Sequence, residues 1–99
     1  MQMVYGYARD RTALGLARQV DDLVAVGIPP ERVFRDVGGT GSNEPRPGLD
    51  ALLAALHPSD EVVTGDPSRL AGGVAELDGL VAALERVGAI ARTLDAEPT

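Results

Sequence analysis

The stretch that decides the fold is Met3-Val-Tyr-Gly-Tyr-Ala-Arg-Asp-Arg-Thr12. Its first half is a short apolar run with aromatic and β-branched residues, which is typical of a β-strand. A helix-period pattern follows directly, so Arg9, Asp10 and Arg11 are expected on the turn between a strand and a helix. In open α/β sheets, ligands bind at this carboxyl edge of the strands. Two arginines at that edge predict an anion as the ligand.

Three later segments have apolar residues at three- and four-residue spacing, which predicts three amphipathic helices. These segments are Ala13 to Gly27, Leu49 to Leu56 and Leu70 to Leu84. Asp10 and Thr12 are candidate caps for the start of the first helix, and Pro47 suits the first position of the second. The positions of Gly27 and Gly88 predict the ends of the first and third helices.

Three further strands are predicted between these helices, at Arg32 to Asp36, Asp60 to Thr64 and Ala89 to Leu94. Residues 37–48 contain four glycines and two prolines and are expected to form a mobile loop. Strands and helices therefore alternate along the whole chain. This alternation predicts a three-layer α/β fold, with an open, mostly parallel sheet in flavodoxin-like order and helices on both faces.

The composition is that of one globular domain, expected to span residues 1–99, because 44% of the residues are hydrophobic and 24% are charged. All nine basic residues are arginine, so mechanisms that need a catalytic or phosphate-binding lysine are excluded. The net charge of −6 argues against a non-specific DNA coat. Contact with DNA phosphate would require locally clustered arginines.

Metal and thiol chemistry have little support, because the chain has no cysteine and one histidine, His57. His57 ends an apolar helix, which favours a capping or solvent-facing role, and we expect neither a metal site nor a cofactor. No segment reaches the roughly 18 apolar residues of a membrane span, and the N-terminus does not have a leader pattern. We therefore expect a cytoplasmic protein without membrane contact.

Arg9, Arg46 and Arg69 each follow a different predicted strand, so they are expected to meet at one edge of the sheet. Three guanidinium groups there would suit a phosphodiester or another oxyanion. Each arginine could instead pair with a nearby carboxylate, for which the candidates are Asp10, Asp36, Asp50 and Asp66.

In its motifs the chain resembles the resolvase and invertase group of serine recombinases, specifically their N-terminal catalytic domain. The matching residues are Gly6-Tyr7-Ala8-Arg9, Gln19, Val33-Phe34-Arg35-Asp36, Arg46-Pro47-Gly48-Leu49-Asp50, Asp60-Glu61-Val62-Val63 and Ser68-Arg69-Leu70. The resemblance implies the fold predicted above and a serine that attacks a DNA phosphate clamped by arginines. It assigns phosphate binding to Arg9, Arg46 and Arg69, with Gln19 and Asp36 in supporting positions.

The departures from the family pattern concern catalysis. Arg11 stands where the family has its nucleophilic serine, Ser68 where it has an aspartate, and Gly72 where it has a further arginine. A guanidinium cannot form a phosphoester, so the family's first chemical step has no nucleophile here. The neighbouring Thr12 is expected to support the fold as a helix cap.

Three functional hypotheses follow. The first is a catalytically inactive resolvase-like domain, not an enzyme, that binds DNA phosphate or a partner protein and can form homo- or hetero-oligomers. The family's dimerisation helix and DNA-binding domain would lie beyond Thr99 and are expected to be absent.

The second hypothesis is the catalytic part of a site-specific DNA recombinase that uses Thr12 as a displaced nucleophile. The third is a small-anion or nucleotide-binding domain, suggested by the glycine-rich residues 38–47, although both common phosphate-loop patterns are missing. If Arg11 points into the arginine cluster it needs a counter-charge, so we expect it close to Asp10, Asp36 or Asp66.

Overall fold

The structure is a computed structural model of the chain, and it describes residues 2–38, 46–65 and 73–94. Four strands alternate with three α-helices in the predicted order. The elements are β1 (Val4–Asp10), α1 (Ala13–Ala25), a short 3₁₀ turn (Pro30–Arg32), β2 (Val33–Val37), α2 (Pro47–Ala55), β3 (Glu61–Thr64), α3 (Gly73–Arg86) and β4 (Ile90–Thr93).

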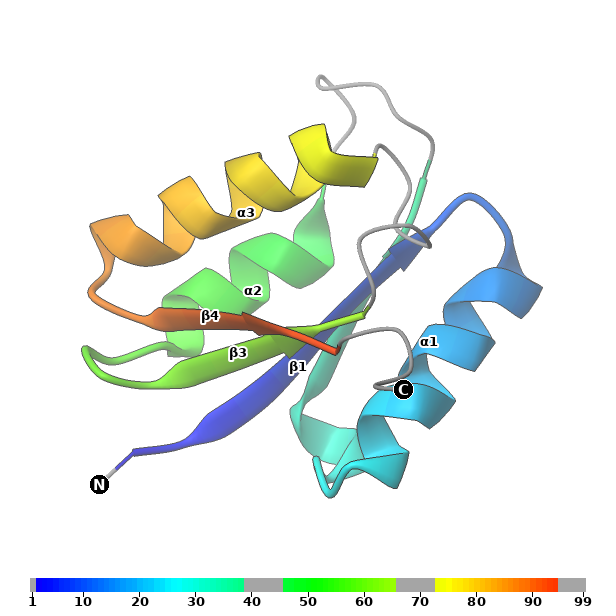
Figure 1. Cartoon of the computed structure of the whole chain (residues 1–99), viewed down its shortest axis with the longest axis horizontal. Coiled ribbons are helices and arrows are strands. Elements are labelled where there is room, and N and C mark those ends of the chain that lie inside the picture. Colours follow the sequence, from blue (N-terminus) through cyan, green and yellow to red (C-terminus); the bar gives the residue numbers. More distant parts are fainter. Residues whose placement is uncertain (1, 39–45, 66–72, 95–99) are drawn as a thin grey trace, which may run out of the picture.

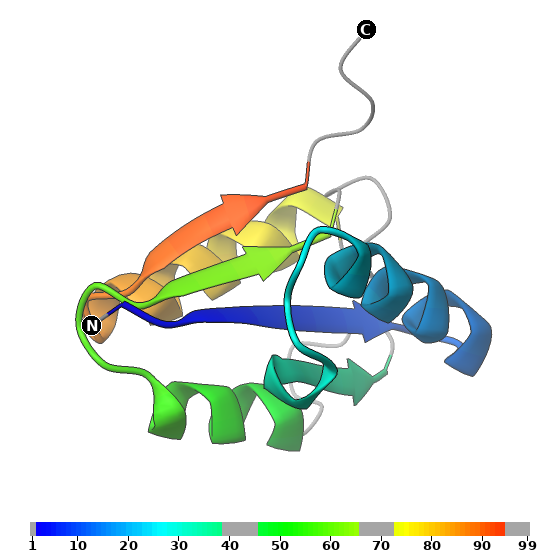
Figure 2. The same ribbon diagram turned by 90° about the horizontal axis from the view of Figure 1, so that it is seen from below.

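The four strands form one parallel sheet in the order β2-β1-β3-β4. Helix α1 covers one face of this sheet, and α2 and α3 cover the other (Figures 1 and 2). The predicted three-layer α/β fold and its flavodoxin-like strand order are confirmed. Because all strands run the same way, their carboxyl ends share one edge, where the predicted arginine site belongs.

The side chains of β1 alternate between two cores, one on each face of the sheet. Tyr7 packs with residues of α2 and α3, among them Leu52, Leu80 and Leu84. Ala8 packs on the other face with α1 through Leu16 and Leu23. Burial of each such leucine stabilises the fold by about 1.5–3 kcal/mol, so β1 is fixed from both sides.

The predicted helix ends are confirmed at four positions. The Thr12 side chain caps α1 by accepting a hydrogen bond from the Gly15 N–H. Pro47 is the first residue of α2. Gly27, with φ of +104°, and Gly88, with φ of +78°, follow the ends of α1 and α3 in a conformation that favours glycine.

The predicted end of the first strand was wrong. Strand β1 continues through Arg9 and Asp10, which pair with Asp36 and Val37 of β2, so only Arg11 belongs to the turn. Pairing with a neighbouring strand overrides the polar sequence here. The second predicted strand is also shifted by one residue, because Arg32 lies in the 3₁₀ turn.

Other sequence predictions extend beyond the described residues. Most of the predicted loop at 37–48 and the predicted start of the third helix at Leu70 lie there. Within the described part of the chain, no helix is long and apolar enough to cross a membrane.

Candidate functional site

Arg9 is the central charged residue of the carboxyl edge. Its Cα pairs with that of Asp36 in the neighbouring strand, and only 1% of its surface is exposed. Because side chains alternate along a strand, Arg9 lies on the same face as Tyr7, the face covered by α2 and α3. A buried guanidinium at a strand end is unusual, since charged side chains are almost never fully buried unless they are paired.

Gln19 fixes the backbone of Arg9 from helix α1. The Arg9 N–H donates to Gln19 Oε1 at 3.2 Å, and Gln19 Nε2 donates to the Arg9 carbonyl at 2.8 Å. The same amide nitrogen lies 3.3 Å from Asp10 Oδ2. Gln19 is buried, so these bonds are shielded from water and hold the end of β1 against α1.

Asp36 joins the sheet to helix α2. Its carboxylate accepts hydrogen bonds from the Tyr7 hydroxyl at 2.7 Å and from the backbone N–H groups of Gly48 and Leu49 at 2.7 and 2.9 Å. It thereby caps α2, whose own N-cap residue, Arg46, makes no side-chain capping bond. Gly48 is required because a Cβ there would overlap the Arg35 carbonyl oxygen.

The Asp36 bonds bring Arg46 to the edge where Arg9 lies. Arg46 is half-buried and directly precedes α2. The helix start that follows it is bonded to Asp36, and Asp36 is in turn the register partner of Arg9. Two of the three predicted anion-binding arginines therefore lie at the same edge, while Arg69 lies outside the described residues.

The turn between β1 and α1 is organised by Asp10. Asp10 Oδ1 accepts bonds from the Thr12 N–H at 2.9 Å and from the Thr12 hydroxyl at 3.1 Å. Hydrogen bonds from the Thr12 backbone, the Thr12 hydroxyl and the Gln19 amide lower the pKa of the Asp10 carboxyl, against the opposing effect of burial. Asp10 is therefore an ionised, hydrogen-bonded part of the turn at neutral pH.

Within the described part of the chain, Arg11 forms no ion pair with two of the three carboxylates that were expected near it. Its side chain is exposed, and no ion pair of the described residues joins it to Asp10 or Asp36. These two carboxylates are engaged by the hydrogen-bond donors given above. The third expected partner, Asp66, lies outside the described residues, as do Ser68 and Gly72.

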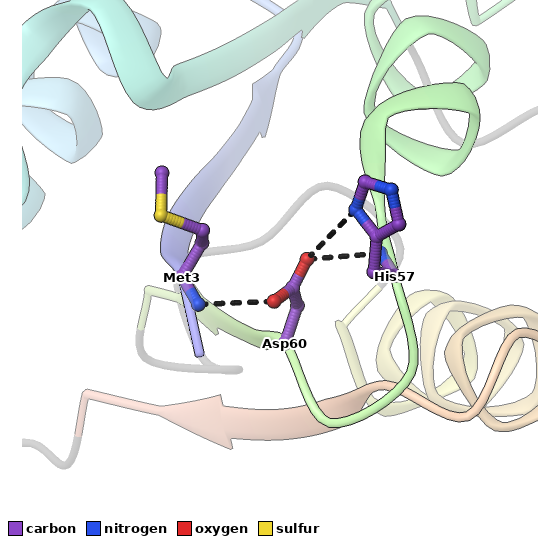
Figure 3. A network of polar contacts seen from close by, with 3 residues as sticks. All are labelled: Met3, His57 and Asp60. Atoms are coloured by element: carbon purple, nitrogen blue, oxygen red, sulfur yellow. Dashed lines mark hydrogen bonds and ion pairs between the residues drawn. The ribbon is translucent and has the colours of Figure 1, made fainter. Parts of the chain in front are cut away.

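The side chain of Asp60 has a structural role that the sequence did not predict. It lies at the opposite, amino edge of the sheet, where its carboxylate accepts the Met3 and His57 N–H groups, both at 2.9 Å (Figure 3). The His57 side chain is 83% exposed, which confirms the solvent-facing prediction. This cluster lies at the edge opposite Arg9 and Arg46, and it joins the start of β1, the end of α2 and the start of β3.

The described residues contain no group of three histidine or acidic side chains placed to hold a metal ion. At the carboxyl edge, the carboxylates of Asp10 and Asp36 accept hydrogen bonds from backbone N–H groups. What this arrangement offers chemically is positive charge on a rigid strand and helix start, suited to holding an oxyanion.

A parallel α/β sheet with arginines at its carboxyl edge defines an open-sheet domain, a class in which ligands are generally bound at that edge. The sequence profile of the family described as Resolvase, N terminal domain, matches residues 4–99. The chain therefore belongs to the N-terminal domain family of the serine recombinases, as its motifs indicated.

Solved structures with the same fold include two from Sulfolobus solfataricus. The first open reading frame of transposon ISC1904 superposes with a TM-score of 0.67 at 24% identity, covering 98% of this chain and 70% of that one. A serine recombinase superposes with a TM-score of 0.66 at 23% identity, covering 100% of this chain and 72% of that one. No curated protein sequence matches the chain.

Proposed function

We propose that this chain is a resolvase-family domain that does not cleave DNA and acts by binding. Arg9 and Arg46 hold an oxyanion, such as a DNA phosphate, at the carboxyl edge of the sheet, with Arg69 as a third contact. Gln19 and Asp36 position these arginines through the backbone of β1 and the start of α2. A partner protein that contributes DNA contacts is consistent with the acidic net charge of −6.

The observation that carries the proposal is the composition of the β1–α1 turn. By the resemblance to the family, Arg11 stands where the nucleophilic serine is expected, and its exposed side chain has no group that could form a phosphoester. The hydroxyl of Thr12 is engaged as the cap of α1 and as a donor to Asp10. The turn therefore offers no hydroxyl directed at a phosphate.

The alternative of Thr12 as a displaced nucleophile depends on Asp10 as its base. The Asp10 carboxylate does accept the Thr12 hydroxyl. However, the hydrogen bonds that lower the pKa of Asp10 make it a poor proton acceptor at neutral pH, where general bases are effective with a pKa near 7. Thr12 is better explained as a structural cap.

The N-termini of α1 and α2 argue against the nucleotide-binding alternative. The N-termini of helices that follow strands commonly bind phosphates through free backbone N–H groups. Here Thr12 caps the start of α1, and Asp36 occupies the start of α2. The hollow beside α1, with a volume of about 350 Å³, is lined by two carboxylates, Asp10 and Asp22, and one guanidinium, Arg18, so its net negative charge disfavours a polyphosphate.

The test of inactivity is covalent capture on DNA. The protein is incubated with a labelled pool of nicked duplexes of randomised sequence, and protein–DNA adducts are sought on denaturing gels and by intact mass. We expect no adduct for the wild type. An adduct from the wild type that disappears in Thr12→Val would overturn the proposal in favour of the displaced nucleophile.

The positive arm of this experiment is the triple variant Arg11→Ser, Ser68→Asp, Gly72→Arg. It restores the family pattern at the three departures, so it is expected to form the serine adduct if the remaining edge still holds DNA phosphate. Binding itself is measured by titration with inorganic phosphate and with a short duplex. Arg46→Gln is expected to weaken binding about tenfold, while Arg86→Gln, an exposed change in the last turn of α3, leaves it unchanged.

A further inference from the structure

The hydroxyl of Thr64 is the one buried polar group of β3 that the site described above does not use. Thr64 is the last residue of β3 and has 0% of its surface exposed. Its Oγ1 has no hydrogen-bond partner within the described part of the chain. Such groups are rare in native proteins, because the lost hydration of a buried hydroxyl is not replaced, and each one calls for an explanation.

Thr64 lies on the same side of the sheet as the arginines. It is the register partner of Tyr7, whose hydroxyl is bonded to Asp36. Arg9 is two residues further along β1, so its side chain is on the same face and diagonal to Thr64 across adjacent strands. Arg9 is equally buried, and an anion that contacts its guanidinium must therefore enter the layer that Thr64 borders.

We infer that the Thr64 hydroxyl donates a hydrogen bond to the oxyanion bound at Arg9 and Arg46. This inference rests on the proposed function and adds a neutral, directional donor to the two guanidinium groups. The ligand it specifies is a tetrahedral oxyanion with at least two accessible oxygens, as in free phosphate or a phosphodiester. A purely structural threonine would fill the same space through its methyl group, so the hydroxyl is the part to test.

The experiment compares Thr64→Val, which removes the hydroxyl at nearly constant shape, with Thr64→Ser, which keeps it. Each protein is titrated with inorganic phosphate, and with a short DNA duplex in a second arm, while the amide signals of Tyr7 and Gly65 are followed by NMR. A hydrogen bond to a charged ligand is worth about tenfold or more in Kd, so Thr64→Val is expected to bind at least that much more weakly. Thr64→Ser is expected to stay within about threefold of the wild type.

Denaturation in urea completes the test. Thr64→Val is expected to be no less stable than the wild type, because it removes an unpaired buried hydroxyl. Wild-type affinity in Thr64→Val overturns this inference and leaves the proposed function intact. Absence of binding by the wild type in both arms overturns the proposed function together with this inference. A response to phosphate without a response to the duplex identifies the ligand as the free anion.

Discussion

Gly15 shows how closely the β1–α1 turn is packed at the level of single residues. A Cβ at this position would overlap the carboxylate of Asp10. That carboxylate cannot move aside freely, since it accepts hydrogen bonds from the backbone and hydroxyl of Thr12. Glycine is therefore required here by a neighbouring side chain, although it lies within a helix.

Replacement of Gly15 by alanine is predicted to lower stability, against the usual preference for alanine in helices. Alanine favours a helix interior by about 1 kcal/mol over glycine. The displaced Asp10 bonds are expected to outweigh this gain and leave a net loss of about 1 kcal/mol. The matched control is Gly79→Ala in α3, where a Cβ meets nothing within 4 Å and a gain of about 1 kcal/mol is expected. Urea denaturation of both variants measures their free energies of unfolding. Equal stabilisation by Gly15→Ala and Gly79→Ala would refute the packing argument.

At the level of elements, the start of α2 depends on a residue of a different element. Asp36 of β2 accepts the Gly48 and Leu49 N–H groups and the Tyr7 hydroxyl, so one carboxylate joins two strands and a helix. Arg46 directly precedes the first turn of α2, so its backbone is held in place by the bonds of Asp36 to Gly48 and Leu49. The position of Arg46 relative to Arg9 therefore depends on the hydrogen bonds by which Asp36 caps α2.

Asp36→Ala is predicted to destabilise the protein by about 2 kcal/mol, because it removes a helix cap and the buried hydrogen bond that Asp36 accepts from the Tyr7 hydroxyl. Hydrogen exchange at the Gly48 and Leu49 amides is expected to accelerate more than exchange in α1. Asp50→Ala removes an exposed carboxylate from the first turn of the same helix and is expected to change stability by no more than about 0.5 kcal/mol. Similar effects of the two changes would show that Asp36 acts only through its charge.

The elements themselves were predictable because their signals are local. The spacing of leucines and valines predicted all three helices, and Thr12, Pro47, Gly27 and Gly88 mark ends that depend on the backbone nearby. The burial of Arg9 was not predictable in this way. The Arg9 backbone is held by pairing with β2 at Asp36 and by the Gln19 side chain of α1, and these residues are 27 and 10 positions away in the sequence.

At the scale of the whole molecule, the two edges of the parallel sheet carry different charged residues. The carboxyl edge carries the buried Arg9, and the amino edge carries Asp60, whose partner Met3 is 57 residues away in sequence. The alternation of strands and helices predicted the sheet and the arginine edge, because topology brings the strand ends together. The alternation did not predict that the Asp60 carboxylate is buried, since a carboxylate next to a turn is ordinarily exposed to solvent.

The amino edge leads to a prediction about acid stability. Hydrogen bonds from the Met3 and His57 backbone N–H groups lower the pKa of the Asp60 carboxyl below its ordinary value of 3.8. Because the pKa of Asp60 is lower in the folded than in the unfolded protein, the ionised carboxylate stabilises the fold. This stabilisation is fully present above the unfolded pKa and is lost as the pH falls through the folded pKa. Asp60→Asn is therefore expected to be less stable than the wild type at pH 7, and the difference should narrow below pH 3.8. Thermal unfolding between pH 7 and pH 3 measures this difference in stability, with the exposed Asp21→Asn as the control. If the difference between wild type and Asp60→Asn does not change with pH, the charge of the Asp60 carboxylate contributes nothing to the stability of this edge.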